Sequence, residues 1–194
     1  MTQLATVLSR GAFGVEAPQV RVEVHISRGM PGLSIVGMPE TAVKESKDRV
    51  RAAIMNSGFE FPQHRITINL SPADIPKHGG RYDLPIAIGI LAASNQVKTS
   101  RMADVEFVGE LALGGELRPI SGILPVVNAA ASQNRCLILP CDNGDEAALV
   151  TLCESRMASN LLQVCAWLDG VDDLAVAHVM KKPKPQNTCP DISD

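Results

Sequence analysis

One short stretch concentrates the residue types that could carry chemistry, "SPADIPKHGGRYDLPIAIGILAA" at residues 71–93. Two glycines and the charged residues Lys77, Arg81 and Asp83 stand there between a strand-like run and an almost wholly apolar helix. A strand-to-helix turn is where proteins often present a nucleophile, bind a phosphate or contact a partner. The surrounding sequence must therefore distinguish catalysis, anion binding and a structural role.

The turn does not match a nucleotide-binding loop. Such a loop requires the pattern G-x-x-x-x-G-K-[ST], so that backbone amides and a lysine surround the phosphates. The run "KHGGR" offers amides and two cations before a helix, which would attract an anion. Asp83 competes for the same donors, however, so we expect no ATP and no other cofactor in this segment.

Neither a catalytic triad nor a metal centre is indicated. Ser71, Ser94 and Ser121 have no histidine or lysine beside them at a recognisable spacing. The four histidines are scattered, and none lies near a cysteine pair. We therefore predict no metal ligands and no cofactor ligands.

A structural role for the turn is the simplest interpretation. Asp83 stands at the expected N-cap of the apolar helix, and Pro85 falls in its first turn. Lys77 and Arg81 would then point outward from the two glycines. The alternative is a surface on which these cations contact DNA or a neighbouring subunit.

Hydrophobic periodicity predicts the elements that position the turn. The run "QVRVEVHIS" alternates apolar and polar residues, which is typical of a half-buried strand, and a second strand follows closely enough for a hairpin. Strands are expected at residues 19–27, 33–37, 65–70 and 135–140, and helices at residues 41–57, 84–94, 123–133 and 159–168. This order predicts a mixed α/β fold.

The predicted helix at residues 41–57 has a cationic outer face. Four basic residues and two acidic residues give it a net charge of +2: Lys44, Lys47, Arg49, Arg51, Glu45 and Asp48. Contact with phosphates by Lys44, Lys47 and Arg51 is one interpretation. A solvated surface is the other.

Charge is divided unevenly along the chain. Residues 1–101 carry a net charge of +4 and residues 102–180 a net charge of -8, within a total of -3. This division would serve head-to-tail assembly of like subunits or a basic face for nucleic acid, and it also fits an uneven solvated surface.

The two chain ends give further expectations. Residues 181–194 are proline-rich, polar and without periodicity, which predicts a linker to something beyond. The first residues lack a basic-then-apolar signal, and no apolar run reaches membrane length. We expect a cytoplasmic protein without a membrane partner.

Two long motifs carry a family resemblance. Residues 14–94, together with "GELALGGELRPISGILPVVNAA" at residues 109–130, resemble the opening domain of the Mg-chelatase-related ComM/YifB family, and the likeness extends over about residues 5–170. Members of that family are bacterial AAA+ ATPases, and one is a hexameric branch-migration helicase of natural transformation. The resemblance implies a Lon-protease-like domain with the ribosomal protein S5 domain 2-like fold at residues 1–180. Residues 181–194 would lead to an AAA+ module that uses ATP and Mg²⁺.

The resemblance also indicates where a Lon-type active site would lie. Lon proteases place a nucleophilic serine in a turn similar to "PKHGGRYDLPIAI" and a lysine base near a segment similar to "RPISGIL". The serine position falls on Asp83 here, and the lysine position falls on Leu124. Neither residue can replace its counterpart, so we expect this segment not to be an enzyme.

The implied function is that of an inactive domain which assembles a ring ATPase and grips single-stranded or branched DNA. Its expected partners are DNA and its own subunits. The candidate DNA contacts are Lys44, Lys47, Arg51, Lys77 and Arg81. A pure oligomerisation scaffold and a residual peptidase or other hydrolase are the alternatives.

Overall fold

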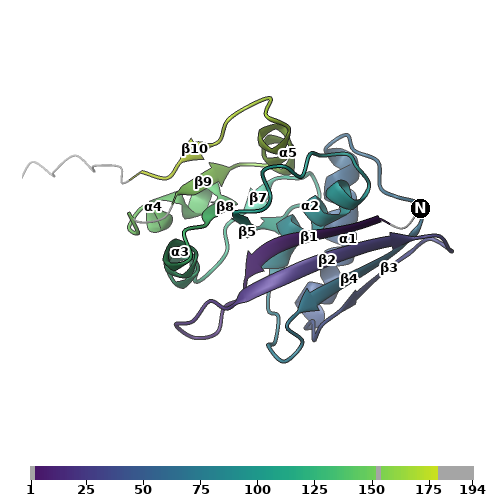
Figure 1. Cartoon of the computed structure of the whole chain (residues 1–194), viewed down its shortest axis with the longest axis horizontal. Helices are drawn as coiled ribbons and strands as arrows, with labels where there is room; N and C mark the ends of the chain where they lie inside the picture. Colours follow the sequence, from purple (N-terminus) through teal and green to yellow (C-terminus); the bar gives the residue numbers. More distant parts are fainter. Residues whose placement is uncertain (1–2, 152–153, 179–194) are drawn as a thin grey trace, which may run out of the picture.

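The computed structural model describes residues 3–151 and 154–178 and shows a mixed β-sheet flanked by helices (Figure 1). Eight strands form the main sheet in the order β10-β9-β8-β5-β1-β2-β4-β3, and β6 and β7 form a separate pair. The strands are β1 (Gln3–Arg10), β2 (Gln19–Ser27), β3 (Gly32–Val36), β4 (Arg65–Ser71), β5 (Val105–Phe107), β6 (Glu110–Leu111), β7 (Leu117–Arg118), β8 (Cys136–Pro140), β9 (Ser155–Ala158) and β10 (Ala175–Val176). The helices are α1 (Thr41–Asn56), α2 (Asp83–Ala93), α3 (Ile123–Ser132), α4 (Gly144–Ala147) and α5 (Leu161–Asp169). The predicted α/β class is confirmed.

The first half of the sheet corrects the expected hairpin. β2 pairs antiparallel with both β1 and β4, whereas β3 pairs parallel with β4. β4 thus inserts between the two strands that are neighbours in sequence. The physical reason is burial, since Ile66 and Ile68 of β4 are fully buried while the side chains of β3 alternate between exposed and half-buried. The more apolar strand takes the inner position.

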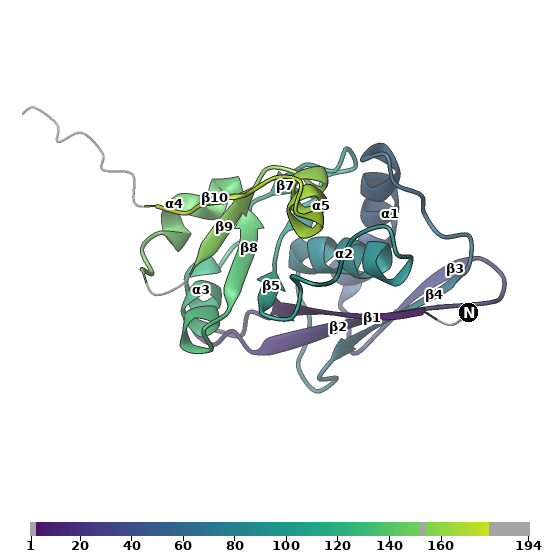
Figure 2. The same ribbon diagram turned by 45° about the horizontal axis from the view of Figure 1, so that its top comes forward.

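Helix α2 forms the centre of the larger core. All its residues are buried, and α1 and α2 lie together on one side of β1–β4, while no helix covers the other side within the described residues (Figure 2). Gly89 permits this close packing, because a Cβ at its position would lie 2.6 Å from a methyl group of Val24. Asp83 and Gly80 are therefore presented at the end of a rigid, fully packed helix.

The second half of the sheet is parallel except for its edge strand β10, which pairs antiparallel with β9. β1, β5, β8 and β9 pair in parallel, and α3 and α4 pack with β8 around a second apolar cluster. Buried Arg10 fixes β5 to the end of β1, since its Nε and Nη2 donate to the Glu106 carboxylate at 2.6 and 2.8 Å. Arg135 Nε lies 3.2 Å from the same carboxylate. This buried charge cluster joins the two halves of the sheet.

Two further expectations concern the C-terminal linker and membrane-spanning helices. The predicted linker at residues 181–194 lies outside the described residues, as does the boundary at residue 180. Within residues 3–151 and 154–178, none of the helices combines the length and apolar character that crossing a bilayer demands.

Candidate functional site

The turn before α2 is held between α1 and the β6–β7 pair. The amide of Glu40, at the start of α1, donates to the Lys77 carbonyl at 3.2 Å, and His78 Nδ1 lies 2.7 Å from the Glu40 carboxylate. On the other side, a Cβ placed on Gly80 would lie 2.4 Å from the carboxylate of Glu110. The Glu110 side chain thus packs directly against the backbone of Gly80, and a larger residue at position 80 would have to displace it.

Asp83 is a buried ion-pair partner and not the predicted N-cap. It is the first residue of α2, and its fully buried carboxylate accepts from Arg49 Nε at 2.7 Å, from the Ser46 hydroxyl and from the Leu111 amide at 3.2 Å. Burial raises the pKa of Asp83, while the bonds from Arg49 and Ser46 act against that shift. The carboxylate therefore ties α2 to α1 and β6. It caps nothing, because its oxygens are used by these tertiary partners.

Lys77 was expected to point outward, and this expectation is wrong. The residue has no exposed surface, and its ammonium donates to the carbonyl of Pro72 within the same loop. Burial lowers the pKa of Lys77 from its ordinary value. A lysine in this position closes the loop at residues 72–77 and offers no charge to a ligand in solution.

Arg81 was also expected at the surface, and it is buried. Its exposed fraction is 7%, and its Nη2 donates to the carbonyl of Ser121 at 3.0 Å. Burial lowers the pKa of this guanidinium. The bond joins the turn at residues 77–83 to the loop before α3, and so brings together the two segments that resemble the Lon active site. Leu124, at the lysine position, is half-buried in the first turn of α3.

At the two positions that resemble the Lon serine and lysine, the joined segments hold Asp83 and Leu124. The serine position holds a carboxylate already engaged by three donors, and the lysine position holds an aliphatic side chain. No cluster of three His, Cys, Asp or Glu residues suited to a metal is found within the described ranges. In the turn, the Glu110 carboxylate lies against Gly80, and Lys77 and Arg81 are both buried.

The cations of α1 divide into two groups. Arg49 was expected on the outer face, but it points toward Asp83 and its side chain is only 24% exposed. Lys44 and Arg51 are exposed and Lys47 is half-buried. Their spacing of three and four residues places these three on one stripe of the helix, which we call the α1 stripe. The guanidinium of Arg51 lies 5.3 Å from the centre of the Phe61 ring.

Two further arginines lie near the α1 stripe. Lys47 and Arg51 line a hollow beside Gly32 and Leu33, at the start of β3. Exposed Arg28 and Arg65 line a second hollow that shares Gly32 and Leu33. The fold therefore gathers cations from α1, the loop before β3 and the start of β4 at one end of the molecule.

Comparison with known proteins agrees with this arrangement of motifs. Residues 22–143, which include α1, the turn and the loop before α3, match the family described as subunit ChlI of Mg-chelatase. The chain belongs to this ChlI family. It is 50% identical to the YifB protein of Escherichia coli over 182 residues, which cover 94% of this chain and 35% of that protein. It is also 50% identical to the competence protein ComM of Haemophilus influenzae over 184 residues, 95% of this chain and 36% of that protein.

The predicted ComM/YifB resemblance is thus confirmed, and the chain spans about a third of the length of these relatives. Similarity to Lon proteases is weaker. Lon protease 2 of Bacillus subtilis is 24% identical over 140 residues, 64% of this chain and 25% of that protein. This likeness accords with the Lon-like class that the motifs indicated.

Sequence reasoning missed the buried pair of Arg49 and Asp83 in this ChlI-family chain. The sequence contains part of the signal for this pair: Ser46 and Arg49 are three residues apart and therefore share one face of the helix, and both contact Asp83. Only the packing of α1 on α2 shows that this face looks inward. Of the cations predicted on the outer face, Lys44 and Arg51 are exposed, Lys47 is half-buried and Arg49 points inward; the DNA-binding role of the α1 stripe stays a prediction.

Proposed function

We propose that this chain is the inactive N-terminal domain of an AAA+ ATPase-helicase that acts in branch migration during natural transformation. In this proposal the domain binds single-stranded or branched DNA and contributes to assembly of a hexameric ring. ATP and Mg²⁺ would serve an ATPase module outside this chain. Membership of the ChlI family and similarity to a competence protein support the proposal.

The α1 stripe is the observation that carries the DNA-binding part. Its cations lie beside Arg28 and Arg65, and within the described residues none of the three forms a salt bridge, while Asp48 lines the same hollow as Lys47 and Arg51. Phosphate contacts of this kind would be independent of base sequence and would weaken as salt rises. Lys77 and Arg81 take no part, because their charged groups face the interior.

The test is fluorescence anisotropy with labelled single-stranded, duplex and four-way-junction DNA at several salt concentrations. Each lost phosphate contact should reduce the slope of log affinity against log salt by about 0.7 for single strands and 0.9 for duplex. The double variant Lys47→Gln with Arg51→Gln should therefore lower that slope by about 1.4 for single strands and about 1.8 for duplex, and weaken binding at low salt. The matched control is Arg118→Gln, since Arg118 is exposed in β7, outside the α1 stripe. Equal affinities for the double variant and the control would refute the proposed contact.

Assembly through charge is the second candidate, because the charge division has a spatial counterpart. Helix α1 lies in one half of the elongated molecule, and α4, whose first turn contains the acidic Asp145 and Glu146, lies toward the opposite end (Figure 1). A head-to-tail contact would bring these ends together in a ring. Sedimentation velocity would then show salt-sensitive self-association without DNA. The hydrolase alternative lacks comparable support, because Asp83 is committed to Arg49.

A further inference from the structure

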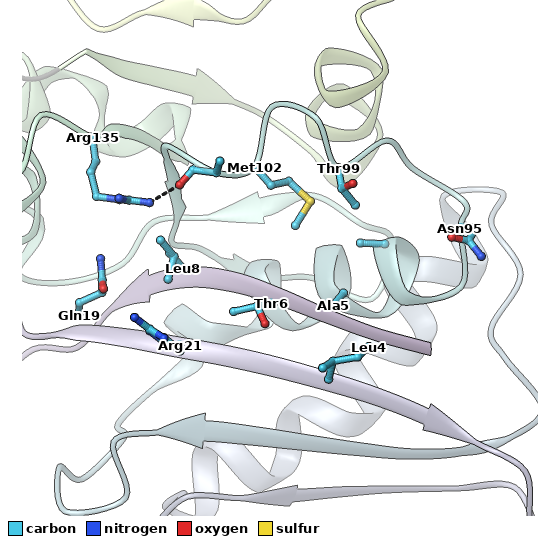
Figure 3. Close-up of a pocket in the computed structure, with 12 residues that line it drawn as sticks. Leu4, Ala5, Thr6, Leu8, Gln19, Arg21, Asn95, Thr99, Met102 and Arg135 are labelled. Atoms are coloured by element: carbon cyan, nitrogen blue, oxygen red, sulfur yellow. Dashed lines mark hydrogen bonds between the residues drawn. The ribbon is translucent and has the colours of Figure 1, made fainter. Parts of the chain in front are cut away.

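A cavity lies beside β1, on the side away from α1. Its volume is about 700 Å³, and it is lined by β1, by the start of β2 and by the loop at residues 95–103. Figure 3 shows Leu4, Thr6 and Leu8 of β1 along one side and Thr99 and Met102 on the loop opposite. No part of the proposed DNA surface lines it.

The cavity borders an unpaired stretch of strand. β1 is eight residues long, but β5 has only three residues and pairs with β1 at one position, Leu8 with Glu106. The bidentate bond from Arg10 to Glu106 keeps β5 at that end of β1. From Gln3 to Thr6, β1 therefore has β2 on one side and no strand on the other within the described part of the chain. These four residues offer about 13 Å of free strand edge.

The loop opposite is held away from this edge by its own bonds. The amide of Lys98 donates to the Asp169 carboxylate at 2.8 Å, and Arg101 Nη1 donates to the Trp167 carbonyl at 2.8 Å. The guanidinium of Arg101 also lies 5.2 Å from the centre of the Trp167 ring. Because both anchors belong to α5, the loop does not collapse onto β1. The gap is a built feature of the fold.

The charge of the lining is uneven. The lining includes the small or apolar side chains of Ala92, Ala103 and Met102 together with the uncharged polar side chains of Thr6, Asn95 and Thr99. Its two charged residues are Arg21 and Arg135, and both lie at the end near Leu8 (Figure 3). Arg135 is engaged with Glu106, whereas exposed Arg21 makes no hydrogen bond or ion pair among the described residues. A carboxylate is the group that would complement this end.

We propose that the open edge of β1 binds an extended peptide segment of a partner protein, with an acidic residue at the end near Leu8. The segment would add a strand beside Gln3–Thr6 through main-chain hydrogen bonds, as in other cases of strand addition. An unpaired edge of this kind is otherwise a liability that proteins cover or charge. Alternate side chains of the peptide would contact Met102 and Leu8, and its carboxylate would pair with Arg21. The proposal is independent of DNA binding.

The test uses two dye-labelled hexapeptides of alternating Thr and Val, one with Glu at its N-terminus and the other with Glu at its C-terminus. Binding of each to the whole chain is measured by fluorescence anisotropy, and one of the two should bind. N-methylation of every second amide of that peptide, tested for both sets of alternate amides, should weaken binding at least about tenfold in the set that bonds to β1, because strand addition needs those donors. Replacing its Glu by Lys should weaken binding to a similar degree. Amide hydrogen exchange should show new protection confined to Gln3–Thr6 when the peptide is bound.

A charge exchange makes the test specific to the cavity. Arg21→Glu should weaken binding of the Glu peptide about tenfold or more and restore binding of the Lys peptide. Arg28→Glu is the matched control, because Arg28 is exposed and lies outside the cavity, and it should leave both affinities unchanged. Binding that ignores N-methylation or the exchange at Arg21 would overturn the proposal. Protection of Gln3–Thr6 without peptide in a self-associated sample would also overturn it, because a second copy would then occupy the edge.

Discussion

The turn at residues 77–83 and the α1 stripe both contain lysine and arginine, but the fold buries these side chains in the turn and leaves most of them exposed in the stripe. In the turn, Lys77 and Arg81 donate to main-chain carbonyls in the interior. In the α1 stripe, Lys44 and Arg51 remain exposed. The difference lies in what surrounds them, since the turn is enclosed by α1, β6 and the loop before α3. Cations therefore stabilise the packing in the turn, and in the α1 stripe they are accessible to a ligand.

The largest effect should come from removing the carboxylate that holds the turn. Asp83→Ala leaves Arg49, Ser46 and the Leu111 amide without their acceptor, so we expect the free energy of unfolding to fall by about 3 kcal/mol. Urea denaturation measures this change. Asp48→Ala on the exposed side of α1 is the control and should change stability by less than about 0.5 kcal/mol. Similar losses in the two variants would mean that the turn is no more structural than the helix surface.

A crossed comparison of two arginines should separate stability from DNA binding. Arg81→Gln loses a charged hydrogen bond to Ser121, so we expect about 2 kcal/mol of destabilisation and unchanged DNA affinity. Arg51→Gln loses only an exposed contact with Phe61, so stability should fall by about 0.5 kcal/mol while DNA affinity decreases. Denaturation and anisotropy on both proteins give the four values. If the Arg81 variant is folded but binds DNA more weakly, the turn would have to be counted as part of the DNA-binding surface.

A small effect at neutral pH should come from Tyr82, which lies in sequence between Arg81 and Asp83. Its hydroxyl is buried and has no partner among the described residues, so Tyr82→Phe should change stability at pH 7 by less than about 1 kcal/mol. Burial raises the pKa of Tyr82 to about 12 from 10.0. Because the pKa of Tyr82 is higher in the folded state than in the unfolded state, the contribution of this tyrosine to the free energy of unfolding is complete below pH 10. It is lost as pH rises from 10 toward 12.

Stability measurements from pH 9 to pH 12 check this dependence. The wild-type chain should lose more stability across this range than Tyr82→Phe, because the phenylalanine has no proton to release on unfolding. Parallel pH profiles of the two proteins would contradict the enclosed environment described for the turn.

The amino-acid sequence determined the local elements of this protein. Alternation in residues 19–27 predicted β2, the apolar run after Asp83 predicted α2, and Gly58 marked the end of α1 within a residue or two. The ComM/YifB motifs also indicated the family, because long runs of specific residues carry that information directly. Strand β1 was not predicted, since the apolar residues of "QLATVLSR" do not alternate regularly.

Tertiary structure alone decided which partners these elements have. The insertion of β4 between β2 and β3, the pairing of Asp83 with Arg49, the burial of Lys77 and Arg81, and the short overlap of β5 with β1 all join distant parts of the chain. Periodicity reports one face of one element at a time and carries no information about what lies opposite. Whether a charged side chain is buried or exposed depends on which element packs against it, and that neighbouring surface exists only after the chain has folded.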